Sequence, residues 1–222
     1  MKKVFIERLV PLLNEEGMDA ILVCPSEELK FLIGFSPMMC ERFQGLFIKN
    51  DGSLFYICNL LYAGELEHEL SGLEIFTWFD GDVMADTVSG ILEREGLTGK
   101  KVGVNSTAPA FCILEIAKKS GITFVNAKPY LEEIRIIKQE EDLENLRISA
   151  SIADKAFDAV VKFIKPGLKE ADIKSFLFSE MEKHGGTKPW ALVATGPNSS
   201  FPHYLGTDRV VETKDVVLLD FG

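Results

Sequence analysis

Two side chains in the C-terminal third of the chain combine a reactive group with a position at or between strands. His203 follows Pro202 and the polar stretch 197–200, and loops held by rigid strands are favoured places for functional side chains. Asp220 ends the apolar run 215–222, where burial of a carboxylate is costly unless it is hydrogen-bonded, paired or bound to a metal. Both could be metal ligands, although one histidine and one aspartate do not complete a site. A structural role for each, such as an aspartate that caps a turn, stays open.

The other motifs that could carry chemistry favour structural explanations. His68 stands between two glutamates on a polar helix face, which is typical of a solvated side chain. His184 falls in the last turn of a predicted helix, where a cationic side chain complements the helix dipole. The sequence Asp220-Phe221-Gly222 is shared with the magnesium motif of protein kinases, but no glycine-rich loop or catalytic-loop motif precedes it.

The bulk composition limits the classes of partner. The 222 residues carry a formal net charge of −10 and give a sequence pI of about 4.9, whereas nucleic-acid-binding proteins concentrate Lys and Arg on one face. We therefore expect no nucleic acid partner. No stretch approaches the roughly 20 consecutive apolar residues that span a bilayer, so we also expect no membrane association.

The termini and cysteines indicate a cytoplasmic protein. Lys2 and Lys3 begin the chain as they would a signal peptide, but Glu7 and Arg8 interrupt the apolar run that should follow. The four cysteines contain no C-x-x-C pair and are expected to be reduced thiols of the core. They are Cys24, Cys40, Cys58 and Cys112.

The elements that must position these residues begin with an alternation of strands and helices. The clearest hairpin signal is the pair of apolar runs 46–49 and 54–58, separated by Asn-Asp-Gly at 50–52. Further strands are expected at 18–24, 73–79, 101–104 and 122–125, and helices at 1–17, 60–70 and 83–95. This pattern predicts an α/β fold in which helices flank a mixed sheet.

Local signals predict several helix ends. Ser26 is expected to cap a short helix that ends at Gly34, and Ser106 a helix that ends near Gly121. Pro11 lies inside the first predicted helix and is expected to kink it or to delay its start.

The rhythm changes near residue 130, where we place the boundary between a domain at 1–129 and a domain at 130–222. The second domain is expected to contain a long helical stretch within 132–164, a helix at 170–184 and strands at 190–196 and 215–222. An almost wholly apolar strand needs covering on both faces and pairing on both edges. We therefore expect that the domain ending on this strand is truncated.

Four ordered segments of the second half share motifs and spacing with one known family. They are Glu133–Glu141 (EIRIIKQEE), Pro166–Glu170 (PGLKE), 194–204 (ATGPNSSFPHY) and Asp215–Gly222 (DVVLLDFG). These segments resemble the pita-bread metallopeptidases, which include prolidase (Xaa-Pro dipeptidase) and aminopeptidase P. The first 130 residues resemble the creatinase-like N-terminal domain of the same family, notably in 8–23 and 31–35.

The resemblance implies a fold and an activity. The fold is a creatinase-like N-terminal domain followed by the incomplete first half of an α+β pita-bread domain. The activity is hydrolysis of the bond before proline in di- or oligopeptides, with two divalent metal ions (manganese, cobalt or zinc) in a homodimer. Asp220 matches the first of five metal ligands, and His203 matches the catalytic histidine that contacts substrate beside the metals.

The chain also departs from the family's pattern. The second aspartate, the histidine and the two glutamates that complete the metal site are absent, so the chain alone is expected to be an inactive N-terminal portion of a peptidase. Lys169 stands where threonine is usual, and Trp190-Ala191 replaces a common Phe-Asp pair. Two alternatives stay open: a non-catalytic dimerisation or partner-binding module, and a creatinase-type amidinohydrolase on the same scaffold.

Overall fold

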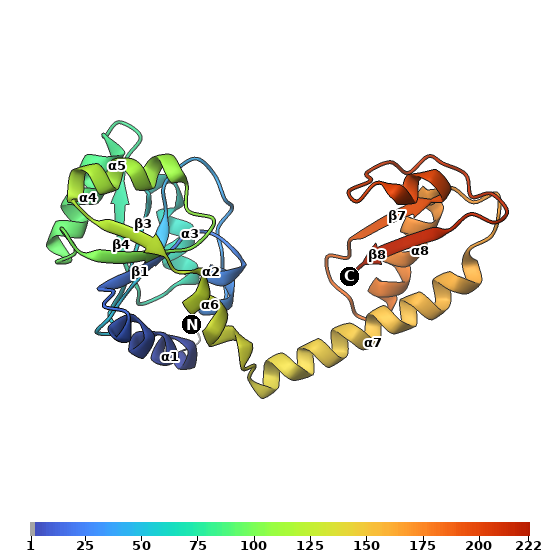
Figure 1. The fold of residues 1–222 in the computed structure, drawn as a ribbon, viewed down its shortest axis with the longest axis horizontal. Coiled ribbons are helices and arrows are strands. Elements are labelled where there is room, and N and C mark those ends of the chain that lie inside the picture. The colour runs from blue at the N-terminus through green and yellow to red at the C-terminus, as the bar shows by residue number, and fades with distance from the viewer. Residues whose placement is uncertain (1–2) are drawn as a thin grey trace. The chain divides into compact units, whose positions relative to one another are not determined.

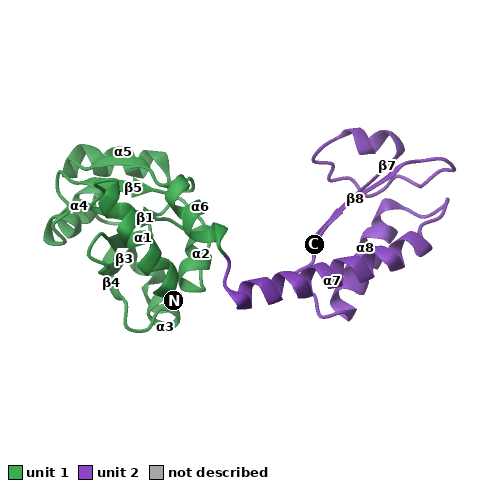
Figure 2. Cartoon of the chain, turned by 60° about the horizontal axis from the view of Figure 1, so that its bottom comes forward, with its two compact units in different colours: residues 1–137 green, residues 138–222 purple. Residues whose placement is uncertain are grey.

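The computed structural model describes residues 3–222 and divides the chain into two compact units, residues 1–137 and 138–222 (Figure 1, Figure 2). The sequence placed the boundary after residue 129, eight residues before the end of the first unit (137 − 129). The difference arises from helix α6 (Lys128–Ile136), which buries Leu131 and Ile134 in the core of the first unit.

The first unit contains one mixed sheet. Its elements, in chain order, are α1 (Lys3–Glu15), β1 (Ala20–Val23), α2 (Glu27–Ile33), β2 (Gly45–Lys49), β3 (Leu54–Asn59), η1 (Leu60–Tyr62), α3 (Ala63–Glu69), β4 (Glu74–Trp78), α4 (Met84–Arg94), β5 (Lys101–Val104), α5 (Ala110–Ser120), β6 (Thr123–Asn126) and α6. Within its described residues, the strand order is β4-β3-β2-β1-β5-β6. Strands β1, β2 and β3 are joined by antiparallel pairing, and the outer pairs are parallel. The predicted mixed sheet is confirmed.

Two apolar layers hold this sheet between helices. One face packs against α1, α2, α3 and α6, and the other packs against α4 and α5. Figure 1 shows α4 and α5 on one side of the strands and α1 on the other. Side chains of a strand alternate between the two faces. Neighbouring residues such as Leu46 and Phe47 therefore enter different layers, and both are fully buried.

The predicted hairpin is confirmed between β2 and β3. Its turn closes through a hydrogen bond from Lys49 N to Ser53 O of 2.9 Å. Asp51 Oδ1 accepts from the backbone N–H of Ser53 at 2.8 Å, which is typical of an aspartate in a tight turn. The two strands bury Phe47 and Phe55 as a stacked pair with ring centroids 4.8 Å apart.

The predicted helix ends have mixed outcomes. Ser26 caps α2, because its Oγ accepts from Leu29 N at 3.1 Å. The prediction for Ser106 is wrong: α5 begins at Ala110, and the extended backbone of Pro109 precedes it. The predicted late start of the first helix is also wrong, because α1 runs from Lys3 through Pro11. The part of that prediction that concerns residues 1–2 lies outside the described residues.

Three of the four cysteines lie in the core, as predicted. All four are free thiols, and Cys24, Cys58 and Cys112 are buried, whereas Cys40 is partly exposed. Burial raises the pKa of Cys112 to about 11.

The second unit is a helical pair packed on a two-stranded sheet. Its elements are α7 (Glu140–Phe163), α8 (Glu170–Lys183), β7 (Ala191–Thr195), the short 3-10 helix η2 (Gly196–Ser200) and β8 (Val217–Phe221). The long helical stretch predicted within 132–164 is interrupted, because Ile137 is extended and Gln139 caps α7. The core lies between the helices and one face of the β7–β8 pair, and Phe163 stacks on Phe176 at 4.1 Å.

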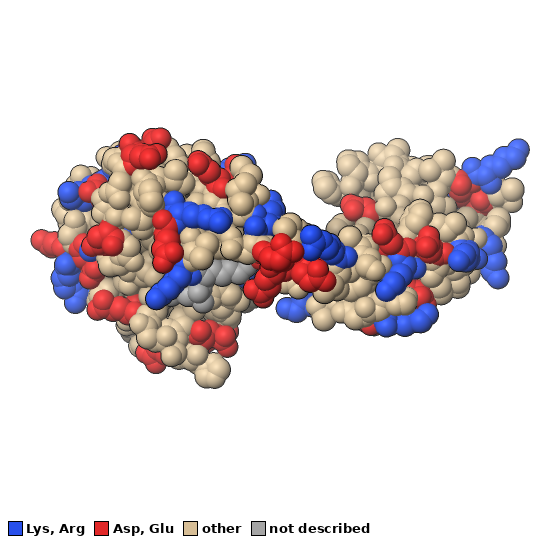
Figure 3. Space-filling model, turned by 90° about the horizontal axis from the view of Figure 1, so that it is seen from below, with Lys and Arg blue, Asp and Glu red and all other residues tan. Residues whose placement is uncertain are grey.

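Within residues 3–222, none of the helices is long and apolar enough to cross a membrane. On the face drawn in Figure 3, Lys and Arg side chains are interspersed with Asp and Glu.

Candidate active site

One pocket of the second unit contains both residues that the sequence singled out. Its volume is about 390 Å³, within the range of small-molecule sites. Its titratable side chains are His203, Asp220, Lys174 and Tyr204. Its other lining residues are Trp190, Ala191, Leu192, Val193, Pro202, Leu205, Gly206 and Thr207. The fold therefore brings His203 and Asp220 to one concave surface.

The β7–β8 hairpin positions Asp220. Asp220 stands opposite Leu192 in the antiparallel register. Alternate residues of a strand face opposite sides, so Val217 and Leu219 pack on the core while Asp220 points away from it and is exposed. The alternative of a buried aspartate that caps a turn is therefore wrong, because Asp220 lies within β8 on its uncovered face.

His203 reaches the same pocket from the segment that follows η2. Pro202, His203 and Leu205 are exposed, so this segment has little apolar packing. The side chains of His203 and Asp220 make no hydrogen bond or ion pair with any of residues 3–222. Both side chains are thus open to a ligand.

A buried carboxylate lies beside this segment. Glu170, the first residue of α8, is 0% exposed. Its Oε1 accepts three hydrogen bonds, from Thr195 N (2.8 Å), Thr195 Oγ1 (3.0 Å) and Asn198 Nδ2 (3.1 Å). Its Oε2 is buried without a hydrogen-bond partner in the described part of the chain. Asn198 Nδ2 also donates to the Tyr204 hydroxyl at 2.8 Å, which joins Glu170 to a pocket-lining side chain.

An arginine extends this network. Arg209 donates to Thr195 Oγ1 at 3.1 Å and forms a two-pronged ion pair with Asp215. The Thr195 hydroxyl therefore donates to Glu170 and accepts from Arg209. Gly196 allows this arrangement: its φ is +51°, and a Cβ there would lie 2.5 Å from Asp215 Oδ1.

The network shifts the pKa values of Asp215 and Tyr204, among others. Hydrogen bonds from Arg209 and from the backbone N–H of Glu212 hold the pKa of the Asp215 carboxyl below its ordinary value. Loss of contact with water, and then the neighbouring Glu170 carboxylate, raises the pKa of the Tyr204 phenol.

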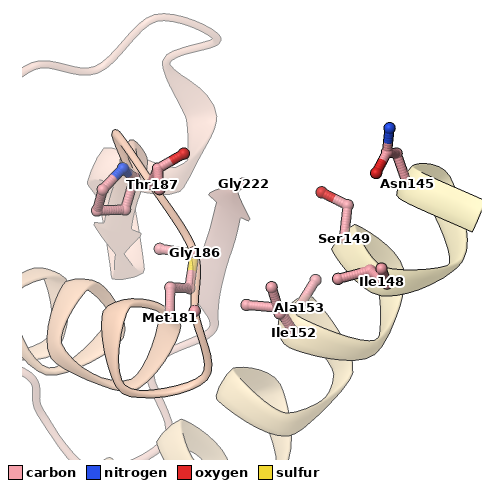
Figure 4. A pocket seen from close by; sticks show the side chains of 11 residues that line it. Asn145, Ile148, Ser149, Ile152, Ala153, Met181, Gly186, Thr187 and Gly222 are labelled. Carbon is pink, nitrogen blue, oxygen red and sulfur yellow. The ribbon is translucent and has the colours of Figure 1, made fainter. Parts of the chain in front are cut away.

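A second pocket in the same unit offers a contrast. It has a volume of about 230 Å³ between α7, the end of α8 and the loop around Gly186. Figure 4 shows Ser149, Ile152 and Ala153 pointing from α7 toward Met181. None of its lining residues is titratable. Acid–base or metal chemistry is therefore better placed in the pocket that holds His203.

The other two histidines lie outside both pockets. The His68 side chain is 85% exposed on α3. His184 lies at the C-terminal end of α8, with its Nε2 3.8 Å from Glu180 Oε2. These positions agree with the structural roles that the sequence favoured.

The donor set is too small for a two-metal centre. Within residues 3–222, no group of three or more His, Cys, Asp or Glu side chains could hold a metal ion. Metal sites usually take three or more protein ligands. Asp220 and His203 offer one carboxylate and one imidazole, so the residues present do not by themselves fit the pair of ions that the family resemblance implies.

Comparison with protein families gives the decisive observation. Residues 6–137 match the model of the Creatinase/Prolidase N-terminal domain. The chain belongs to this family. Residues 144–222 match Metallopeptidase family M24, so the pocket with His203 and Asp220 lies in a partial metallopeptidase domain. The mixed N-terminal sheet and the incomplete second domain are as the resemblance implied.

Individual relatives of the chain support the same family assignment. An Xaa-Pro dipeptidase of Pyrococcus horikoshii is 26% identical over 98% of this chain and 59% of its own length. A probable dipeptidase PepE of Mycobacterium tuberculosis is 26% identical over 94% of this chain and 56% of its own. The solved structure of an Xaa-Pro dipeptidase from Bacillus anthracis is 27% identical, with a TM-score of 0.77, over 98% of this chain and 60% of its own. The chain thus spans less than two thirds of these relatives.

The sequence did not indicate a role for Glu170, Arg209 or Asp215. Glu170 lies in a motif that supported the family resemblance, but a glutamate at the start of a helix is usually explained by the helix dipole. Arg209 stands in a charged stretch that is typical of a solvated linker, and Asp215 begins the motif segment 215–222 without having been singled out there. Only the fold shows that they meet around Thr195.

Proposed function

We propose that this chain is the N-terminal portion of a dinuclear-metal-dependent Xaa-Pro peptidase, which hydrolyses the bond before proline in di- or oligopeptides. The observation that carries the proposal is the shared pocket of His203 and Asp220 in a domain that matches M24 metallopeptidases. Asp220 would be one metal ligand, and His203 would contact the scissile peptide beside the metal. Manganese, cobalt or zinc would supply an activated hydroxide and polarise the carbonyl.

The first test is the reading frame after the codon for Gly222. If it continues into a second aspartate, a histidine and two glutamates, the longer protein should cleave an Xaa-Pro dipeptide when manganese is supplied. Replacement of His203 by Ala should lower kcat/KM by about 100-fold or more, as expected when a group that stabilises the transition state is lost. The exposed variant Glu182→Ala should retain activity. A stop codon after Gly222, or cleavage of creatine in place of the peptide, would reject the proposal.

We also propose that the protein is a homodimer. Large apolar side chains that follow the parallel strands β3 and β4 lie at one edge of the sheet and are exposed, among them Leu60 (54%), Leu61 (68%) and Phe79 (57%). Exposed apolar patches of this kind mark interaction surfaces. Sedimentation equilibrium should give twice the 24.7 kDa mass of the chain, and a concentration-independent monomer would contradict the proposal.

A cytoplasmic location is our last proposal on function. It is supported by the four free thiols, because secreted proteins of this size usually oxidise their cysteines. Fractionation of cells that express the tagged chain would test it, and recovery from the culture medium or the periplasm would contradict it.

A further inference from the structure

Glu170 is completely buried, and the proposed function does not account for this burial. Burial of a carboxylate is costly unless the group is hydrogen-bonded. Glu170 offsets that cost through Oε1, which accepts three hydrogen bonds, while Oε2 has no hydrogen-bond partner within residues 3–222. All three donors belong to Thr195 and Asn198, where the chain leaves β7.

The backbone at the start of α8 also holds residues 207–209, where the chain returns from the pocket. The backbone N–H of Glu170 donates to Arg209 O at 3.0 Å, and that of Ala171 donates to Thr207 O at 2.9 Å. Residues 195–198 and 207–209 are therefore held to the first turn of α8 by hydrogen bonds. The chain between them carries His203 and Tyr204 into the pocket.

The intervening segment has few other restraints. Phe201, Pro202, His203, Leu205 and Gly206 are exposed. Segments with few buried apolar contacts open at low free-energy cost, so their order depends on polar anchors. The anchor nearest to His203 is Tyr204, whose hydroxyl accepts from Asn198 Nδ2 at 2.8 Å, and the same amide donates to Glu170.

We propose that Glu170 is a positioning residue: its buried carboxylate holds the segment 195–209 in the conformation that presents His203 and Tyr204 to the pocket. Glu170 acts through Thr195 and Asn198 and does not touch a ligand itself. The inference deepens the proposed function because the segment carries His203. Its test measures conformation and needs no peptidase activity, so failure of the inference and failure of the proposed function are distinguishable.

The test is amide hydrogen exchange of the 222-residue chain with three variants. Glu170→Leu removes the acceptors, whereas Glu170→Gln keeps a carbonyl oxygen where Oε1 lies. Glu182→Leu is the matched control, since Glu182 is exposed on the same helix. In Glu170→Leu, exchange within 195–209 should accelerate about 10- to 100-fold, because hydrogen bonds to a charged group are lost. Exchange in the interior of α7 should not change. Glu182→Leu should stay within about twofold of the parent, and Glu170→Gln should lie between the parent and Glu170→Leu.

The imidazole of His203 gives a second, local signal. Its ¹H–¹³C resonance, identified by its loss in His203→Ala, should move toward the unfolded-chain position in Glu170→Leu, while those of His68 and His184 stay fixed. Equal acceleration in the Gln and Leu variants, acceleration spread evenly over 138–222, or no acceleration would overturn the proposal. If Glu170→Leu unfolds the second unit, Asn198→Ala decides. It should accelerate exchange at His203 and Tyr204 about tenfold, and an unchanged rate would reject the role.

Discussion

The antiparallel pairs β2–β3 and β7–β8, here called the first and second hairpin, differ in how their conformation is held. The β2–β3 hairpin lies inside a six-stranded sheet with helices on both faces, and most of its side chains are buried. In the β7–β8 hairpin, β8 alternates between partly buried and exposed residues, because only one face packs on helices within the described residues. The first hairpin depends on apolar packing. The loops around the second depend on polar contacts among Glu170, Thr195, Arg209 and Asp215.

Each unit contains one of the two tryptophans, so the two can be followed separately. Trp78 is 8% exposed in the first unit, and Trp190 is 53% exposed in the second. The variants Trp190→Phe and Trp78→Phe would leave one fluorescent reporter for each unit.

The largest effect is expected for Phe47→Ala in the first hairpin. Phe47 is fully buried and stacks on Phe55, so truncation should cost the first unit about 3–5 kcal/mol of unfolding free energy. Urea unfolding followed by Trp78 measures it. Phe111→Ala is the control, because Phe111 is 58% exposed. Equal losses in both variants would mean that the sheet does not depend on its central packing.

A smaller loss is expected for Gly196→Ala in the second hairpin. The left-handed φ of +51° and the approach of Asp215 Oδ1 should cost about 1–3 kcal/mol, reported by Trp190. Gly17→Ala, followed by Trp78, separates the two causes, since Gly17 has a similar φ of +61° but an added Cβ would meet no atom within 4 Å. A loss for Gly196→Ala no larger than that for Gly17→Ala would show that the arginine–aspartate pair does not restrict this turn.

A smaller difference between the two units is expected in how their stability depends on pH. The pKa of Asp215 is lowered in the folded state by Arg209, so this carboxylate stabilises the second unit above its unfolded pKa of about 3.9. That contribution is lost as the pH falls through the lower folded value. Asp215→Asn should therefore reduce the difference in the midpoint of the Trp190 transition between pH 6 and pH 3.

The first unit supplies the control for this pH effect. Asp80 is paired with Arg42, and its pKa is also lowered, but its side chain is 51% exposed against 12% for Asp215. Asp80→Asn should change the Trp78 transition less than Asp215→Asn changes the Trp190 transition. The reverse order would contradict the greater dependence of the second unit on polar contacts.

The smallest effect is expected for Leu218→Ala, on the uncovered face of β8. Leu218 is 39% exposed and lies on the same face as Asp220, so its truncation should change the unfolding free energy by no more than about 0.5 kcal/mol. Urea unfolding followed by Trp190 measures this change. A loss comparable to that of Phe47→Ala would show that this face is covered in solution, which would support a partner there.

The two hairpins also differ in how far the sequence predicted them. Asn-Asp-Gly between apolar runs predicted β2–β3 because a turn signal and burial are local properties. The pairing of β7 with β8 and the shared pocket of His203 and Asp220 depend on contacts between distant residues. The prediction that His203 and Asp220 are functional rested mainly on the family motifs. The anchoring by Glu170 was not predictable, because the identity of its donors depends on where β7 ends relative to α8.

The fastening of residues 195–198 and 207–209 to one helix end has a consequence for sequence variation. The chain between these anchors is a closed loop, and doubling the length of such a loop costs only about 0.6 kcal/mol of closure entropy. Insertions on either side of His203 and Tyr204 can therefore alter the rim of the pocket without disturbing Glu170 or the strand that carries Asp220. The helix start and the strand are the fixed frame, and the rest of the loop is the part that can diversify.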